Sequence, residues 1–259
     1  MAVRKPWSRA ELLVAASLYC RIPFGRFHSR NPELIHVAER IGRTSSALAM
    51  KLSNLASVDP TFRETGRRGL ASASSADRAI WDEMNADWPR FAVAAQRALD
   101  EFGLYDAPAI EDSVVAPETE VPDYAGRMRV ANRRERVGQD LFRDAVLSAY
   151  EHRCCITGLA VPALLNASHI VPWREDPENR LNPANGLCLS ALHDRAFDKG
   201  FISLRDDLTI MVSRHGRGEA GAFYEEAIEA YADREIFRPE KFEPHRAFLD
   251  RHRTEIFLG

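Results

Sequence analysis

The chain has 259 residues, of which 45% are hydrophobic and 28% charged, a composition typical of globular proteins with one large domain or two modest ones. Its apolar runs are all shorter than the roughly 18 residues that a membrane span requires, which argues against a membrane protein. The first residues include basic side chains but no apolar core or cleavage site of a signal peptide. We therefore expect a cytoplasmic protein whose four cysteines are thiols.

The net charge of −3 hides an uneven distribution of charge along the chain. Residues 1–57 contain nine Lys and Arg against three Asp and Glu, a local net charge of +6 (9 − 3). Residues 100–123 contain eight acidic side chains and no basic one. A basic first part is compatible with contacts to nucleic-acid phosphates, although an unevenly charged solvated surface would have the same composition.

The first part of the chain predicts a series of short helices. Ser8 and Glu11 form a capping-box pattern before an apolar run, and Asn31-Pro32 marks the start of a second helix. Thr44 or Ser45 is expected to cap a third helix after a tight turn at residues 42–44. This order of helix, turn and helix resembles a helix-turn-helix module.

The third helix and the turn before it carry polar side chains suited to phosphates or base edges. We expect Arg43, Ser46, Lys51 and Asn54 to contact DNA if the module is a DNA-binding one. A small helical bundle without any nucleic-acid role is the alternative interpretation of the same pattern.

The sequence predicts an α+β protein with two domains. Residues 1–104 would form an all-α domain, which ends with an amphipathic helical stretch at 76–102. Residues 105–126 are acidic and contain prolines, as is typical of a linker. Residues 127–259 would form the second domain, and its first helix carries Arg143 on a polar side as a further candidate DNA contact.

The second domain continues with the predicted order strand, loop, strand, helix. A strand at 164–171 contains His169, a second strand covers 186–189, and Ser190 caps a helix at 191–198 that contains His193. Folding the hairpin against this helix should bring the two histidines within reach of one ion. A hairpin at 201–212 and helices at 219–231 and 244–256 are expected to complete the domain.

These residue types suit the hydrolysis of a phosphodiester, which requires a base, a divalent cation and stabilisation of the leaving oxygen. A neutral histidine can act as the base at physiological pH. A second histidine can bind the cation, and an asparagine that bonds backbone or ring N–H groups can hold the base in one tautomer.

The order of motifs resembles the HNH endonuclease family, and its bacterial restriction-like branch in particular. The motifs are Cys155-Ile-Thr-Gly158, Ser168-His-Ile-Val-Pro-Trp173, Asn185-Gly-Leu-Cys-Leu189, Leu192-His193 and Ala196-Phe-Asp198. The resemblance implies a ββα-metal fold and a restriction- or defence-like endonuclease that acts on double-stranded DNA. It also implies that His169 is the general base, Asn185 the orienting residue and His193 a metal ligand.

One position departs from the family pattern. Many members carry Asp or His directly before the first motif histidine as a further metal ligand, whereas this chain has Ser168. A hydroxyl is a weak ligand for Mg²⁺ or Mn²⁺, the cations expected here, with Zn²⁺ and Ni²⁺ as alternatives. Asp198, Asp194, water or a DNA phosphate could complete the ligand set.

Two other functions remain open at this stage. A DNA-binding regulator with a non-catalytic HNH-like scaffold would explain Ser168, but it would not require both histidines. A nuclease directed at RNA would be expected to carry an RNA-binding module with exposed aromatic side chains, which the sequence does not suggest. Cleavage of both DNA strands would require a homodimer or two binding events.

Overall fold

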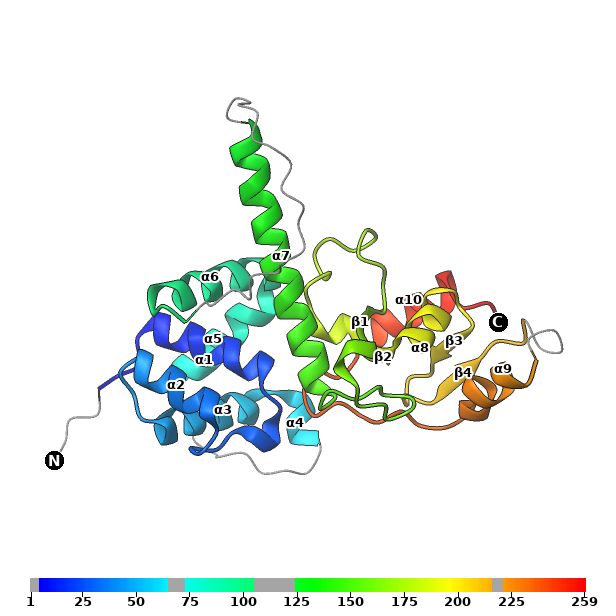
Figure 1. Cartoon of the computed structure of the whole chain (residues 1–259), viewed down its shortest axis with the longest axis horizontal. Helices are drawn as coiled ribbons and strands as arrows, with labels where there is room; N and C mark the ends of the chain where they lie inside the picture. The colour runs from blue at the N-terminus through cyan, green and yellow to red at the C-terminus, as the bar shows by residue number, and fades with distance from the viewer. Residues whose placement is uncertain (1–4, 65–72, 105–123, 216–220) are drawn as a thin grey trace.

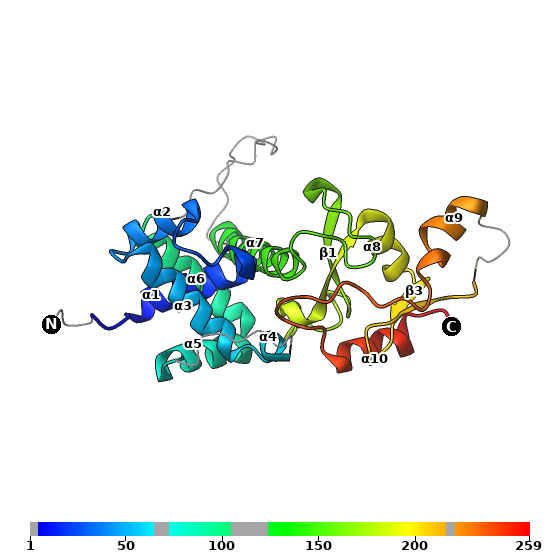
Figure 2. The ribbon, with the colours of Figure 1, turned by 90° about the horizontal axis from the view of Figure 1, so that it is seen from below.

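The computed structural model describes residues 5–64, 73–104, 124–215 and 221–259. Helices make up the N-terminal half, and two small antiparallel hairpins with further helices make up the C-terminal half, so the α+β class is confirmed (Figure 1). The two halves lie on either side of the long helix α7 (Tyr124–Ala149), as both views show (Figures 1 and 2). None of the described helices combines the length and the apolar character needed to span a bilayer.

The N-terminal helices begin at the positions that the capping patterns of the sequence predict. Ser8 forms a reciprocal capping box with Glu11, Asn31 caps the helix that starts with Pro32, and Thr44 accepts a hydrogen bond from the Ala47 amide. Gly42 has φ +67° in the turn before Thr44, a conformation that favours glycine. The elements are α1 (Arg9–Arg21), η1 (Phe24–Arg26), α2 (Pro32–Arg40), α3 (Ser45–Val58), α4 (Pro60–Glu64), α5 (Ser75–Ala86) and α6 (Trp88–Glu101).

The single helical stretch predicted at 76–102 is wrong in one respect, because it is two helices. The backbone leaves the helical region at Asp87, which has φ −157°, and the Asp87 carboxylate accepts the Arg90 amide 2.9 Å away. Pro89 lies in the first turn of α6, where its missing N–H costs no helical hydrogen bond. The sequence Asp87-Trp88-Pro89 therefore marks the start of a new helix, although the apolar periodicity continues across it.

Helix α7 connects the two halves of the molecule. It packs against α1 and α6 on one side and against both strands of the first hairpin on the other. Buried apolar side chains form one continuous cluster from Leu12 to Leu249. The fully buried Lys241 donates to the carbonyl oxygens of Cys20 and Ile22, at 3.1 and 3.0 Å, and so caps the end of α1. The proposed linker lies largely outside the described residues, and the division into two domains stays a prediction.

The C-terminal half begins with the predicted hairpin and helix. Strand β1 pairs antiparallel with β2, and α8 follows directly. The second predicted hairpin is confirmed, and the last helix begins two residues later than expected. The elements are η2 (Pro162–Leu164), β1 (Leu165–His169), η3 (Pro183–Asn185), β2 (Gly186–Ser190), α8 (Ala191–Asp198), β3 (Ile202–Leu204), β4 (Ile210–Val212), α9 (Gly221–Ala227), η4 (Glu229–Tyr231) and α10 (Arg246–Glu255).

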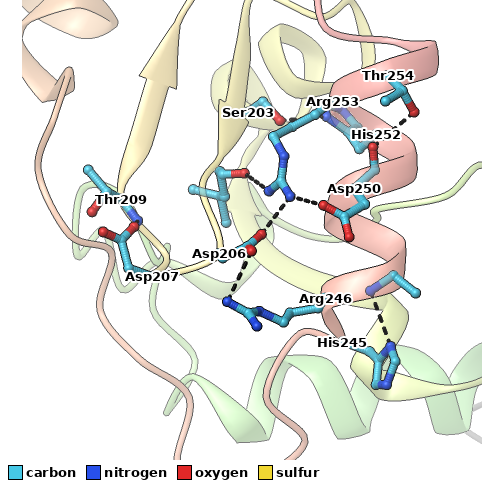
Figure 3. Close-up of polar contacts among 12 residues, drawn as sticks. Ser203, Asp206, Asp207, Thr209, His245, Arg246, Asp250, His252, Arg253 and Thr254 are labelled. Atoms are coloured by element: carbon cyan, nitrogen blue, oxygen red, sulfur yellow. Dashed lines mark hydrogen bonds and ion pairs between the residues drawn. The ribbon is translucent and has the colours of Figure 1, made fainter.

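Polar contacts join the second hairpin to α10 (Figure 3). Arg253 and Arg246 both form ion pairs with Asp206 in the turn between β3 and β4. His252 is buried, and its Nδ1 lies 2.9 Å from the Ser203 hydroxyl on β3. Arg246, His252 and Arg253 therefore brace the hairpin.

Candidate functional site

The hairpin β1–β2 packs against α7, and its strand β1 forms one side of a cleft. His169, the last residue of β1, pairs with Gly186, the first residue of β2. A Cβ at Gly186 would lie 2.4 Å from a Val146 methyl carbon on α7, so a larger residue could not occupy this position without a shift. Ser190 caps α8, and Gly200 with φ +72° follows its end. The predicted strand, strand and helix are thus held in place by local signals and by close packing on α7.

The cleft has a volume of about 730 Å³ and is lined by α7, β1, the loop after β1, α8 and α10. It brings together three of the predicted site residues of this half, Ser168, His169 and Asp198, with Arg143. Asp194 also lines it, four residues before Asp198 and therefore on the same face of α8. Asn185 and His193 are not among its lining residues.

The hydrogen bond of His169 defines its tautomer. Its Nε2 lies 2.8 Å from the carbonyl oxygen of Arg180, and a carbonyl only accepts, so Nε2 carries the proton. Nδ1 is left with a lone pair. The ring stacks on Phe142 at 4.1 Å between centroids and meets Trp173 edge-on at 5.4 Å. Burial lowers the pKa of His169, which favours the neutral form that can accept a proton.

Asn185 holds the loop that supplies this carbonyl. Its side chain is fully buried, its Oδ1 accepts the Val171 amide at 2.8 Å, and its Nδ2 donates to the Val171 carbonyl at 3.2 Å. These bonds fix the start of the loop against its end, so the carbonyl of Arg180 is held beside His169. In this structure Asn185 contacts the backbone of the loop and does not bond the imidazole, and its role as the orienting residue stays a prediction.

Side chains of β1 and α8 supply oxygen atoms in the cleft that could bind a cation. The hydroxyl of Ser168 is buried and has no hydrogen-bond partner among the described residues. Asn166 donates to Asp194 at 2.7 Å. Burial and the neighbouring Asp194 carboxylate raise the pKa of Asp198, as expected where two carboxylates share one site. The sequence analysis offered Asp194 only as one of several groups that could complete the ligand set, and its spacing of four residues from Asp198 is the signal that could have favoured it.

His193 lies in different surroundings from those that the sequence suggested. Its side chain is 3% exposed, and Nε2 bonds the carbonyl oxygen of Ala227 at 2.9 Å. Its Nδ1 lies 2.8 Å from the hydroxyl of its own N-cap, Ser190. Because the carbonyl can only accept, Nε2 is the protonated nitrogen and Nδ1 accepts from the serine. In this arrangement neither nitrogen offers a lone pair to a metal, which corrects the expected role as a ligand.

The donor set fits a hard divalent cation only in part. Among the described residues, His, Cys, Asp and Glu side chains form no group of three or more that could hold a metal ion. Mg²⁺ is commonly held by one or two carboxylates together with waters and substrate phosphates. The carboxylates of Asp194 and Asp198, with the unpartnered hydroxyl of Ser168 nearby, suit that kind of site better than a closed site of protein ligands.

The four residues of the first half that were predicted to contact DNA differ in whether their side chains are already paired within the protein. Arg43 forms an ion pair with the buried Glu11 at 2.8 Å, and Lys51 is 6% exposed and pairs with Asp77. Both cations are thus neutralised within the protein, which corrects the expectation that they are free to meet phosphates. Ser46 is exposed and Asn54 half-buried, and for both a DNA contact stays a prediction.

Arg143 is exposed at the rim of the cleft, where one guanidinium nitrogen donates to the Leu165 carbonyl at 3.0 Å. Arg195 of α8 and Lys199, which directly follows α8, are exposed at the same cleft. The lining of the cleft therefore combines carboxylates with cations.

Comparison with known protein families identifies a match in this part of the chain. Residues 154–205 match the model of a family described as HNH endonuclease, and the match includes both strands of the first hairpin and all of α8. No curated protein gives a significant match to the chain. The helix-turn-helix character of the first half has no such support and stays a prediction. Such a domain suggests a nuclease or another nucleic-acid-related function, and this chain carries an HNH endonuclease domain at residues 154–205.

Proposed function

We propose that this protein is a divalent-metal-dependent DNA endonuclease, restriction- or defence-like, in which His169 activates the attacking water. The observation that carries the proposal is the hydrogen bond from Nε2 of His169 to the Arg180 carbonyl. It leaves Nδ1 as a proton acceptor beside a cleft lined by three carboxylates, Asp140 of α7 and Asp194 and Asp198 of α8. A neutral, oriented imidazole of this kind is what a general base at physiological pH requires.

In the proposed reaction His169 takes a proton from water at Nδ1 while the water oxygen attacks phosphorus. A P–O bond to the water oxygen forms, one P–O bond of the DNA backbone breaks, and the departing oxygen is protonated from solvent. Arg143, Arg195 and Lys199 at the rim would attract the flanking phosphates. Asp194 and Asp198 would hold the divalent cation, which when bound neutralises charge on the phosphate.

DNA is the proposed substrate, and one cleft of this kind would cut one strand at a time. The first product expected from a supercoiled plasmid is therefore the nicked circle. Cleavage of both strands would need a homodimer or a second binding event. The homodimer and a cytoplasmic location both stay predictions.

The test is a plasmid-nicking assay with purified protein in Mg²⁺ or Mn²⁺, with EDTA as the metal-free arm. Wild-type protein should nick the plasmid, and His169→Ala should lower the rate by about 10²–10⁴-fold, the usual contribution of a general base. His36→Ala removes an exposed histidine on α2 and is the matched control, which should cut like the wild type. Undiminished nicking by His169→Ala would overturn the mechanism, and DNA binding without any cleavage by the wild type would favour the regulator.

A further inference from the structure

A second cavity adjoins the catalytic cleft on the side of the N-terminal helices. It has a volume of about 780 Å³ and lies between α6, the start of α1, α7 and the loop that follows β1. Trp173 lines both this cavity and the catalytic cleft, so the two are neighbours across one side chain. Figure 1 shows α6 beside α7, which borders the cleft on its other side. We call this second cavity the α6 groove.

The α6 groove is rich in arginine. Arg9, Arg90, Arg97 and Arg180 line it, against Asp87 and Glu135 as the acidic residues, a net charge of +2 (4 − 2). Arg90 and Arg97 are exposed, and within the described part of the chain neither forms an ion pair. Arg9 is the exception, because it pairs with Glu83.

Arg180 lies at the junction of the two cavities. Its guanidinium carbon is 4.9 Å from the ring centroid of Trp173, and its Nε is buried without a hydrogen-bond partner among the described residues. The backbone carbonyl of the same residue orients His169. An anion bound at Arg180 would therefore contact the segment that positions the proposed base.

The spacing of the two free arginines suits a nucleic-acid backbone. Arg90 and Arg97 lie seven residues apart on α6, which at about 1.5 Å per residue separates them by roughly 10 Å along the helix. One strand of a duplex rises by about 3.4 Å per phosphate along the duplex axis, so side chains separated by this distance can reach different phosphates of one strand. The residues between them that line the groove, Val93 and Ala94, carry no charge that would oppose such a contact.

We propose that the α6 groove binds the phosphate backbone of duplex DNA to one side of the bond that is cut. The identity of the duplex as substrate rests on the proposed function, whereas the groove is argued from its own charge and position. The N-terminal half would then contact DNA through α6, and not through Arg43 and Lys51, whose charges are satisfied by Glu11 and Asp77.

The proposal is tested by fluorescence anisotropy with a labelled DNA duplex in EDTA, in the cleavage-deficient His169→Ala background, over a series of salt concentrations. Arg90→Gln/Arg97→Gln should lower the slope of log Kd against log salt by about 1.8, because each lost phosphate contact contributes about 0.9. At about 0.15 M salt that corresponds to a loss of affinity on the order of thirtyfold. Arg90→Lys/Arg97→Lys should retain most of the slope, because charge is preserved.

Arg30→Gln/Arg78→Gln is the matched control, because it removes two exposed arginines that line neither cavity. It should leave the affinity and the slope unchanged, and thermal melting should show all variants folded. An unchanged slope in the Arg90→Gln/Arg97→Gln protein would overturn the proposal, as would equal losses in the control. Tighter binding of an RNA duplex of the same length would overturn the assignment to DNA. Since binding is measured without cleavage, the two proposals can fail separately. If Arg90→Gln/Arg97→Gln weakens binding but the wild-type protein does not nick plasmid DNA, the proposed function is refuted and the groove stands.

Discussion

The surroundings of the two motif histidines differ although both histidines belong to the same ββα unit. His169 uses one ring nitrogen for the Arg180 carbonyl and keeps the other lone pair at the wall of the cleft. His193 uses both ring nitrogens within the protein, for Ser190 and Ala227, and lies away from the cleft. Burial lowers the pKa of both side chains, so the difference between them is not one of protonation.

The comparison teaches that the partners of a histidine decide its role. A neutral imidazole with one occupied N–H is oriented and still basic, whereas one with both nitrogens occupied contributes to stability instead. The carboxylates proposed to hold the cation lie one residue along α8, at Asp194, and one turn further, at Asp198, and both line the cleft.

The largest difference is expected between His169→Gln and His193→Gln. The first should lower single-turnover cleavage of a DNA duplex by about 10²–10⁴-fold without changing stability strongly. The second should lower the free energy of unfolding by about 1–3 kcal/mol, because it disturbs two buried hydrogen bonds. The folded fraction should still cleave within about threefold of the wild type, less than 1 kcal/mol in activation free energy. A folded but inactive His193→Gln protein would contradict the roles assigned to both residues.

The carboxylates should give the next largest effect. Asp194→Asn and Asp198→Asn should each raise the Mn²⁺ concentration needed for half-maximal cleavage by at least about tenfold, the lower end of what losing an outer-shell partner costs. Asp82→Asn, which changes an exposed carboxylate on α5, is the control. A Mn²⁺ titration of the nicking rate measures this directly. If both variants need the same Mn²⁺ concentration as the wild type, Asp194 and Asp198 do not hold the cation.

The smallest expected effect is on the pH dependence of the free energy of unfolding, and it comes from His252. Burial lowers the pKa of this side chain to about 4, from 6.5 for the unperturbed group. Between these values the unfolded chain binds a proton that the folded chain does not, so stability is lost as the pH falls from 6.5 towards 4. Between pH 7 and pH 5 the loss should be about 2 kcal/mol.

Urea unfolding at the two pH values measures this loss, and His252→Gln should make it smaller. A pH dependence that is the same in the wild type and in His252→Gln would exclude His252 as its source. Above pH 6.5 the cleavage rate should not change through protonation of His169, because the lowered pKa of this side chain keeps the proposed base neutral there.

Most of the fold near the site could be predicted from local signals. The caps at Ser8, Asn31, Thr44 and Ser190 are short-range patterns, and the structure begins a helix after each of them. The break at Asp87 was missed because apolar periodicity continues across it, although Pro89 was visible in the sequence. The order of motifs around His169, Asn185 and His193 was sufficient to identify the HNH domain.

The sequence by itself determined the elements, their order and the residue types available for chemistry, since these depend on neighbours within a few positions. Only the tertiary structure decided which groups are free to act. The carbonyl that occupies His193 comes from Ala227, and the carboxylates that neutralise Arg43 and Lys51 come from Glu11 and Asp77. Such partners are brought together by packing of elements distant in the chain. The same packing placed α6 beside the cleft and left Arg90 and Arg97 exposed in the α6 groove.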